Sequence, residues 1–290
     1  MVEVTSDLIC TKLKKRVPDA HKGDFGRLTI VAGSRGMFGA SMMATLAAMR
    51  TGSGLTTLAS ASSVVSCVAS GLMEAMTLPL NETQTGGLDA SCIAVLLSHL
   101  QKQTACVIGC GLGMTDEIKQ IVKDIIKNTK CKLLLDADAL NALAETPELL
   151  KSCVQMPVVT PHPGEMARLC GTEISSVLSN PPKLARTFAQ TYGCVTVLKG
   201  HRTVIASPDG ALFQNTTGNA GLAKGGSGDI LSGMVGAFLA QGLSALDAAI
   251  CAVWIHGAAA DRLIDRMALT GILARDVIDE IPVVMKTLDL

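Results

Sequence analysis

Aromatic side chains are scarce in this chain of 290 residues, in which one Trp, one Tyr and five Phe make up 2% of the sequence. This scarcity removes the stacking surfaces on which single-stranded nucleic acids usually bind. Net charge is absent too, because 25 basic side chains balance 25 acidic ones at neutral pH. No global positive field attracts a nucleic acid or an anionic membrane, and we expect neither as a partner.

Paired cysteines and long apolar segments are also missing. None of the ten Cys forms a Cys-x-x-Cys pair, and several lie in apolar runs such as 104–108. This pattern predicts no zinc site or disulfide framework and favours buried thiols in a reducing compartment. The longest uncharged region, 51–73, is interrupted by Gly, Ser and Thr and is a poor membrane span. The first residues carry acids where a signal peptide needs bases, so we expect a cytoplasmic protein.

Short apolar runs typical of buried strands alternate with helical patterns along the chain. No linker, low-complexity segment or repeat divides it, so we predict a single α/β domain over residues 1–290, with a mainly parallel sheet flanked by helices on both faces. The segment 207–210 (SPDG) predicts a hairpin turn between the last two strands. The predicted strands are 27–31, 55–59, 105–108, 132–135, 158–160, 194–198, 203–206 and 211–214, and the predicted helices are 39–50, 90–100, 116–128, 181–192, 229–241, 245–265 and 275–284.

The segment 218–233 reads GNAGLAKGGSGDILSG and contains a loop that is almost free of side chains. Gly225, Gly226, Ser227 and Gly228 can turn their backbone N–H groups toward an anion. The apolar run behind them predicts a buried helix, whose N-terminus favours phosphate. Asp229 does not fit phosphate binding, because a carboxylate repels the ligand. It suits proton abstraction from an attacking hydroxyl or, as the alternative, capping of the helix.

Five other motifs follow predicted strands, at the sheet edge where open α/β proteins bind ligands. Asp136 and Asp138 can cap helices, His162 between two prolines can be a rigid turn, and Lys199 can be a solvated charge. The coincidence of all five motifs on one edge favours a shared ligand site instead. They are 32–36 (AGSRG), 109–113 (GCGLG), 136–141 (DADALN), 160–165 (TPHPGE) and 199–203 (KGHRT).

Together these motifs resemble the carbohydrate-kinase-like family of ADP- or ATP-dependent NAD(P)H-hydrate dehydratases, which have the ribokinase-like fold. Two positions deserve note: Cys110 stands where the family usually has Pro, and the segment after Gly200 is one that the family varies. The resemblance implies a hydro-lyase that repairs NADH or NADPH hydrated at carbon 6 of the nicotinamide ring. The nucleotide phosphorylates the hydroxyl of the S form, and loss of phosphate restores the double bond. The matching segments are 21–26 (HKGDFG), 109–113, 135–141, 160–165, 199–200 and 218–233.

The resemblance also implies residue roles. Asp229 would remove the hydroxyl proton, while Gly226 and Gly228 hold the transferred phosphoryl group. Mg²⁺ would bridge the nucleotide phosphates, and we identify no protein ligand for it. Between the two donors we favour ADP. The implied substrate-binding residues are Ala40, Gly111, His162 and Asp229, and the implied nucleotide-binding residues are Lys199, Gly200, His201, Arg202, Thr203, Asn219, Gly225, Gly226, Ser227 and Gly228.

Two other functions stay open at this point. A small-molecule kinase of the same fold, acting on a hydroxymethylpyrimidine, a thiazole or a sugar alcohol, would share Asp229 and the glycine loop but leave a stable phosphate ester. A catalytically idle nucleotide sensor would show no turnover, and the intact Asp229 argues against it. We expect a homo-oligomer, with a tetramer as one form, and functional pairing with an NAD(P)H-hydrate epimerase.

Overall fold

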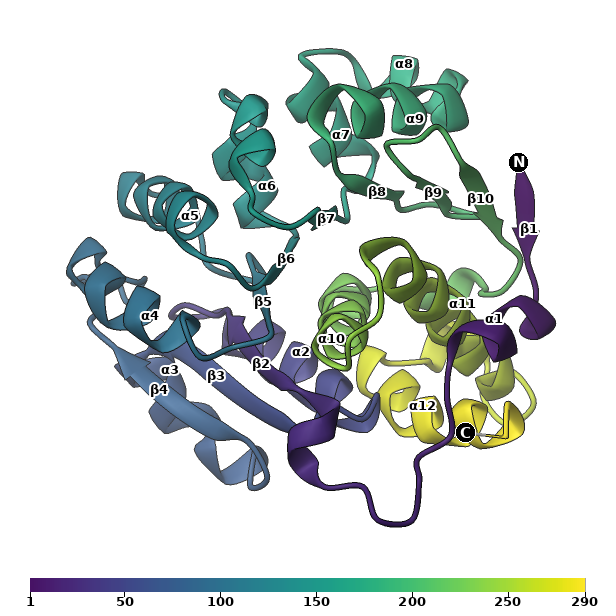
Figure 1. Cartoon of the computed structure of the whole chain (residues 1–290), viewed down its shortest axis with the longest axis horizontal. Coiled ribbons are helices and arrows are strands. Elements are labelled where there is room, and N and C mark those ends of the chain that lie inside the picture. Colours follow the sequence, from purple (N-terminus) through teal and green to yellow (C-terminus); the bar gives the residue numbers. More distant parts are fainter. Residues whose placement is uncertain (290) are drawn as a thin grey trace.

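A ten-stranded sheet curves through the computed structural model, which describes residues 1–289 (Figure 1). The strand order is β1-β10-β9-β8-β7-β6-β5-β2-β3-β4. β9 is antiparallel to both of its neighbours, and the other paired strands are parallel. The strands are β1 (Val2–Val4), β2 (Arg27–Val31), β3 (Leu55–Ala61), β4 (Met76–Leu80), β5 (Ala105–Ile108), β6 (Lys132–Leu135), β7 (Val158–Val159), β8 (Val195–Leu198), β9 (Val204–Ala206) and β10 (Leu212–Asn215).

Helices cover both faces of the sheet (Figure 1). Side chains alternate along β2, so Leu28 and Ile30 join the core under α2, α10, α11 and α12, whereas Val31 joins the core under α4, α5 and α9. The α-helices are α1 (Ser6–Lys12), α2 (Phe38–Arg50), α3 (Ser62–Val68), α4 (Ile93–Leu100), α5 (Asp116–Asn128), α6 (Asp138–Leu143), α7 (Pro163–Cys170), α8 (Ile174–Ser179), α9 (Pro181–Tyr192), α10 (Ser227–Ala240), α11 (Ala245–Leu263) and α12 (Ala274–Thr287). Short 3-10 turns are η1 (Lys22–Phe25), η2 (Ala69–Gly71), η3 (Ala90–Cys92), η4 (Pro147–Ser152), η5 (Ala220–Leu222) and η6 (Leu269–Gly271). Within residues 1–289, no helix is both long enough and apolar enough to cross a bilayer.

The predicted α/β architecture is confirmed, and β2, β5, β6, α5 and α9 have the predicted bounds. The predicted hairpin is also present, with β9 and β10 antiparallel and Gly210 at φ +90°. The sequence pattern misses β1 and β4, which lie at the two edges of the sheet where burial is incomplete. It also misses α1, α3, α6, α7 and α8, helices of eight residues or fewer that are too short to show a clear period.

Helix α10 lies deep in the molecule because two of its glycines permit very close packing. A Cβ on Gly233 would stand 2.1 Å from the Ala44 carbonyl oxygen of α2, and one on Gly236 would stand 2.3 Å from Val107 of β5. Every residue from 230 to 240 is buried. The helix is therefore fixed between α2 and the sheet, and this contact sets the position of its N-terminus.

We expect Gly233→Ala to destabilise the protein by about 1–3 kcal/mol, because the new methyl group overpacks the α2–α10 contact. The matched control is Gly39→Ala in the first turn of α2, where an added Cβ meets nothing within 4 Å. That variant should be neutral or up to about 1 kcal/mol more stable. Urea unfolding of both variants measures the difference, and equal stabilities would show that α2 and α10 separate without cost.

Candidate active site

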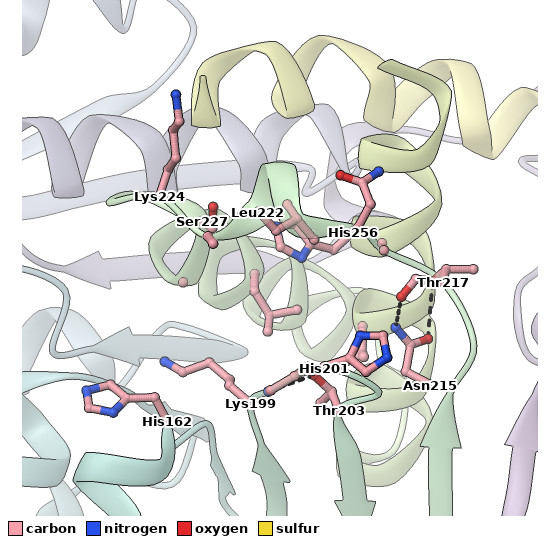
Figure 2. Close-up of a pocket in the computed structure, with 18 of the residues that line it drawn as sticks. His162, Lys199, His201, Thr203, Asn215, Thr217, Leu222, Lys224, Ser227 and His256 are labelled. Carbon is pink, nitrogen blue, oxygen red and sulfur yellow. Dashed lines mark hydrogen bonds between the residues drawn. The ribbon is translucent and has the colours of Figure 1, made fainter. Parts of the chain in front are cut away.

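A cavity of about 660 Å³ opens beyond the carboxyl ends of β6, β7 and β8 (Figure 2). One side is formed by residues that directly follow these strands: Asp136 and Ala137 after β6, His162 after β7, and 199–203 after β8. The other side comes from the segment 215–224 and from the starts or faces of α10 and α11. Figure 2 shows Lys199 and His162 on the first side and Ser227, Leu222 and His256 on the second.

The N-terminus of α10 lies in this cavity and has the features of an anion-binding site. Gly226 is the N-cap at φ +97°, a conformation that favours glycine, and Ser227 and Gly228 begin the helix. Within residues 1–289 the amide hydrogens of Gly228 and Asp229 have no backbone acceptor, as is usual in a first helical turn. A Cβ on Gly228 would stand 3.4 Å from the Lys199 ammonium nitrogen. Free amides and an ammonium group therefore face the same point, where a phosphoryl group fits.

Two details of this segment correct the sequence analysis. The helix begins at Ser227, two residues before the predicted start, so Asp229 occupies the third helical position. The alternative role of Asp229 as the helix cap is wrong, because Gly226 holds that position. A Cβ on Gly226 would meet Met43 at 2.5 Å and Ala274 at 3.0 Å, so this glycine is needed for packing as well as for its φ angle.

Lys199 is buried among carboxylates and is not a solvated charge. Its ammonium donates to Asp136 Oδ1 at 2.8 Å and lies 3.7 Å from Glu165 Oε2. The second oxygen of Asp136 accepts a hydrogen bond from Ser232 of α10 at 2.7 Å. Burial opposes the charge of Lys199, but Asp136 and Glu165 outweigh it and raise the pKa of the ammonium. Asp136 does not cap a helix, and neither does Asp138, which accepts from the Gly113 amide at 2.8 Å.

The turn that contains His162 is both a rigid cap and a cavity wall. His162 is the N-cap of α7, and its Nδ1 accepts from the amides of Gly164 and Glu165 at 3.0 and 3.3 Å. Nδ1 is therefore unprotonated, and Nε2 carries the proton 3.3 Å from Glu165 Oε1. Burial, Lys199 and Arg168 all lower the pKa of His162, so the ring is neutral near pH 7. Its edge lines the cavity.

Asp229 has the electrostatic properties of a base. Burial and the neighbouring Asp136 raise its pKa from 3.8 to about 6, although Cys110 and Lys199 act in the opposite direction. The carboxylate is thus ionised at neutral pH but binds a proton far more readily than an exposed aspartate. It lies beside the free amides of the α10 N-terminus, where a hydroxyl that attacks a phosphoryl group would need its proton removed.

Most of the residues that the family resemblance implies as substrate-binding or nucleotide-binding line the cavity, and three of them do not. Ala40, Gly111 and Gly225 lie outside its lining. Ala40 and Gly111 nevertheless meet each other: a Cβ on Gly111 would stand 2.9 Å from that of Ala40, and Gly111 has φ +63°. Those that line it are His162, Lys199, Gly200, His201, Arg202, Thr203, Asn219, Gly226, Ser227, Gly228 and Asp229.

Sequence analysis missed other members of the site. Asp136 was included in one of the five edge motifs, but its partnership with Lys199 was not predicted, because the two residues lie 63 positions apart. Asn215, Leu222 and His256 also line the cavity. A single His in an apolar helix carries no sequence signal that separates a cavity wall from a core position, and only the packing of α11 against 215–224 reveals it.

The raised pKa of Asp229 predicts a stability cost that depends on pH. The native state binds the proton more tightly than the unfolded state, so this group's favourable contribution is complete below pH ~4 and is lost as the pH rises through about 6. Asp229→Asn should therefore be more stable than the parent at pH 7.5, by at most about 3 kcal/mol. The two proteins should converge near pH 4 in chemical unfolding, and equal stability at pH 7.5 would show that ionised Asp229 is not destabilised.

Comparisons with known proteins agree with this geometry. Residues 28–283 match the carbohydrate-kinase family model described as NAD(P)H-hydrate dehydratase. The ADP-dependent (S)-NAD(P)H-hydrate dehydratase of Neisseria meningitidis is 39% identical over 91% of this chain and 86% of that protein. The bifunctional NAD(P)H-hydrate repair enzyme of Moorella thermoacetica is 38% identical over 96% of this chain, but the chain spans only 53% of that enzyme.

Solved structures agree as well. The ADP/ATP-dependent NAD(P)H-hydrate dehydratase of Bacillus subtilis, co-crystallised with ATP and Mg²⁺, superposes with a TM-score of 0.85 at 31% identity, covering 99% of this chain and 98% of that one. A ribokinase-like superfamily protein from Enterococcus faecalis has a TM-score of 0.82 at 28% identity and covers 99% and 96% of the two chains. The family model and the near full-length relatives lead to one conclusion: this chain belongs to the carbohydrate-kinase-like NAD(P)H-hydrate dehydratase family.

Proposed function

We propose that this chain uses ADP or ATP to dehydrate the S form of hydrated NADH or NADPH and so restores the reduced dinucleotide. Family membership supports the reaction, and the relative from Neisseria meningitidis carries ADP dependence and the S configuration in its name. The observation that carries the mechanism is the position of Asp229, a carboxylate with a pKa of about 6 in the first turn of α10, beside unpaired amides and Lys199.

In the first step the 6-hydroxyl of the substrate attacks the terminal phosphorus of the nucleotide. Asp229 takes the hydroxyl proton, a new O–P bond forms, and the bond to the leaving nucleotide breaks, which converts ADP to AMP or ATP to ADP. Phosphoryl transfer depends mainly on positioning and on stabilising charge on the transferred group. The amides of Gly228 and Asp229 and the ammonium of Lys199 supply that stabilisation without reorganising, because packing already fixes α10 and β8.

In the second step phosphate leaves carbon 6, and the adjacent ring carbon loses its proton to an oxygen of the departing phosphate or to water, which forms the double bond. The ring nitrogen can push electrons toward the bond that breaks, so the leaving group needs only charge stabilisation. The same amides and Lys199 that hold the phosphoryl group can hold the departing phosphate. A site built for phosphoryl transfer thus serves both halves of the reaction, since the charge develops on the same atoms.

The hydrated ring would be presented to Asp229 from the side of His162. We propose that the substrate lies against the backbone at Ala40 and Gly111. A larger side chain at Gly111 would collide with Ala40 and Met37. Cys110 precedes Gly111 and its thiol lowers the pKa of Asp229, so contact between the 109–113 loop and this carboxylate supports the proposal. On the other side, 199–203 with Asn219 and 226–228 would hold the nucleotide.

Mg²⁺ supplies charge neutralisation of the nucleotide phosphates when it is bound, and the donor set of the cavity fits a hydrated ion. Within residues 1–289 no group of three acidic, His or Cys side chains is arranged to hold a metal directly. Asp136 and Glu165 are buried carboxylates beside the cavity, and both already pair with Lys199. Magnesium that keeps its waters and binds phosphate oxygens needs no tighter protein cage.

We also propose the wider context expected from the sequence: a cytoplasmic homo-oligomer, with a tetramer as one form, that works with an NAD(P)H-hydrate epimerase. The epimerase would supply the S form that this chain consumes. The bifunctional repair enzymes support this pairing, because the present chain spans about half of their length, 53% in Moorella thermoacetica and 48% in Escherichia coli.

The reaction is tested by incubating the protein with hydrated NADH, Mg²⁺ and ADP or ATP. We expect recovery of the reduced-nicotinamide absorbance together with one phosphate released per NADH formed. Hydroxymethylpyrimidine and hydroxyethylthiazole serve as controls, because a hydroxyethylthiazole kinase shares the fold at a TM-score of 0.59 and 15% identity. A stable phosphate ester from either alcohol, with hydrated NADH inert, would replace the dehydratase with a small-molecule kinase.

The pH profile tests the base. Asp229 must be ionised to accept the proton, so kcat/KM should be half-maximal near pH 6 and fall tenfold per unit below it. Asp229→Asn should lose about 10²–10⁴-fold in turnover while nucleotide affinity is kept. The matched control is Asp116→Asn, at an exposed position in the first turn of α5, which should leave both unchanged. An acid limb that persists unaltered in an active Asp229→Asn enzyme would exclude this carboxylate as the base.

A further inference from the structure

Both ends of the 109–113 loop are bonded to one residue, Asp138, which the mechanism above does not use. The Asp138 amide donates to the Gly109 carbonyl at 3.3 Å, and the Asp138 carboxylate oxygen Oδ2 accepts from the Gly113 amide at 2.8 Å. Asp138 is the first residue of α6, at the edge of the sheet where β6 ends. This one residue therefore bridges the start and the end of the loop that follows β5.

The 109–113 loop needs such support because its backbone is permissive. Gly109, Gly111 and Gly113 all have positive φ, at +134°, +63° and +79°. Glycine loses more conformational freedom on folding than any other residue, so alternating glycines favour a mobile loop. Leu112 is buried, but a Cβ on Gly113 would meet nothing within 4 Å among residues 1–289. The Gly113 end of the loop therefore depends on its hydrogen bond to Asp138 and not on packing of its own backbone.

Side chains of α6 and α7 orient the Asp138 carboxylate. Asn141 Nδ2 donates to Asp138 Oδ1 at 3.4 Å, and Asn141 Oδ1 accepts from Arg168 Nε at 2.9 Å. Each carboxylate oxygen thus has a polar neighbour, and a satisfied hydrogen-bond network restricts the side chains that form it. The network joins the loop 109–113, the segment 136–141 and the helix that follows the segment 160–165, which are three of the motifs at the sheet edge.

The residue before Asp138 has a strained backbone. Ala137 is the N-cap of α6 and has φ +47° and ψ −115°, a combination that residues with a Cβ rarely adopt. Such conformations persist where the surrounding structure imposes them, and they are frequent at functional sites. With this turn the chain leaves β6 and begins α6 at Asp138, within bonding reach of both Gly109 and Gly113. The local cost therefore falls on the residue that presents Asp138 to the loop.

The loop that Asp138 holds lies beside the proposed base. The Cys110 thiol contacts the Asp229 carboxylate, and a Cβ on Gly111 would stand 2.9 Å from that of Ala40. The proposed substrate wall and the base are therefore neighbours. A shift of the loop would move the wall relative to Asp229, and a fixed loop makes binding more favourable because less ordering remains to be done.

Asp138 also acts on the base through its charge. Asp229 faces titratable groups on the segments after β5, β6 and β8 and on α6, namely Cys110, Asp136, Lys199 and Asp138. Burial and the negative charges of Asp136 and Asp138 raise the pKa of Asp229, whereas Cys110 and Lys199 lower it. Removing the charge of Asp138 while keeping its hydrogen bonds thus has a separate and measurable effect.

We propose that Asp138 is a positioning residue, which holds the 109–113 loop in the conformation that receives the hydrated dinucleotide. Asn141 and Arg168 orient its carboxylate for this purpose. The inference deepens the proposed function and rests on it for the identity of the substrate. Asp138 lies outside the cavity lining, so its loss should weaken binding of the dinucleotide more than it slows the chemical step or weakens the nucleotide.

Steady-state kinetics with hydrated NADH, Mg²⁺ and ADP separates positioning from general damage to the fold. In Asp138→Ala the KM for hydrated NADH should rise about tenfold or more, because a hydrogen bond to a carboxylate is lost. The kcat and the KM for ADP should change much less. The matched control is Asp89→Ala, which removes another half-buried carboxylate that accepts a backbone amide, that of Ser91, at 2.8 Å and lies outside the cavity lining. Equal rises in both KM values of Asp138→Ala, or no rise in either, would overturn the proposal.

The conservative variant Asp138→Asn separates the hydrogen bond from the charge. An amide oxygen can still accept from Gly113, so the KM for hydrated NADH should recover most of the way to the parent value. The lost negative charge lowers the pKa of Asp229, so the acid limb of kcat/KM should move to lower pH. A KM as high as that of Asp138→Ala would show that Asp138 does not act by accepting from Gly113.

Hydrogen exchange of the Gly113 amide tests the support of the loop without turnover. In the unmodified protein this amide should be protected, and in Asp138→Ala it should exchange about tenfold faster or more, while the Ile121 amide within α5 is unaffected. An unprotected Gly113 amide in the unmodified protein would overturn the role of Asp138 even if the enzyme is active. Protection that depends on Asp138, in a protein that does not turn over hydrated NADH, would overturn the proposed function and leave Asp138 as the residue that holds the loop.

Discussion

The site depends on one buried ammonium, Lys199, that cannot neutralise all the carboxylates around it. Asp136 accepts a hydrogen bond from the ammonium at 2.8 Å and another from the Ser232 hydroxyl at 2.7 Å. Glu165 and Asp229 receive less of the positive charge, and burial raises the pKa of both. Environments that push the pKa values of neighbouring acids apart give those acids different roles. Here Asp136, which accepts a hydrogen bond from the ammonium, holds Lys199 in place. Asp229, whose pKa is raised, remains available to take a proton.

The sheet topology explains how these groups meet. β6, β7 and β8 are adjacent and parallel, so their carboxyl ends bring Asp136, His162 and Lys199 to one edge. Opposite them stands the N-terminus of α10, whose depth is set by Gly233 and Gly236. The two sides contribute different groups. Lys199 brings a positive charge that is shared with Asp136 and Glu165, and the α10 N-terminus brings amides without backbone acceptors.

Local patterns were enough to predict eight of the ten strands and the glycine loop, because strand burial and the need for glycine are visible in short stretches of sequence. The start of α10 was predicted two residues late, since Ser227 and Gly228 are weak helix formers and the helix start follows from the packing of the N-cap Gly226 against Met43 of α2 and Ala274 of α12. The partnership between Asp136 and Lys199 spans 63 positions, and the packing of α11 against 215–224 includes a Thr217–Trp254 hydrogen bond across 37 positions. Such contacts follow from topology and leave no trace in residue spacing.

The two sides of the cavity differ in the number of charged groups that they carry. Toward Lys199 and α10, charges are concentrated and incompletely balanced, and the ionised Asp229 lowers the stability of the fold at neutral pH. The wall formed by α11 is uncharged at His256, because burial and the positive charge of Lys199 both lower the pKa of this imidazole. Lys199 therefore affects both walls of the cavity: its positive charge lies beside the α10 N-terminus, and the same charge helps to keep the His256 imidazole on α11 neutral.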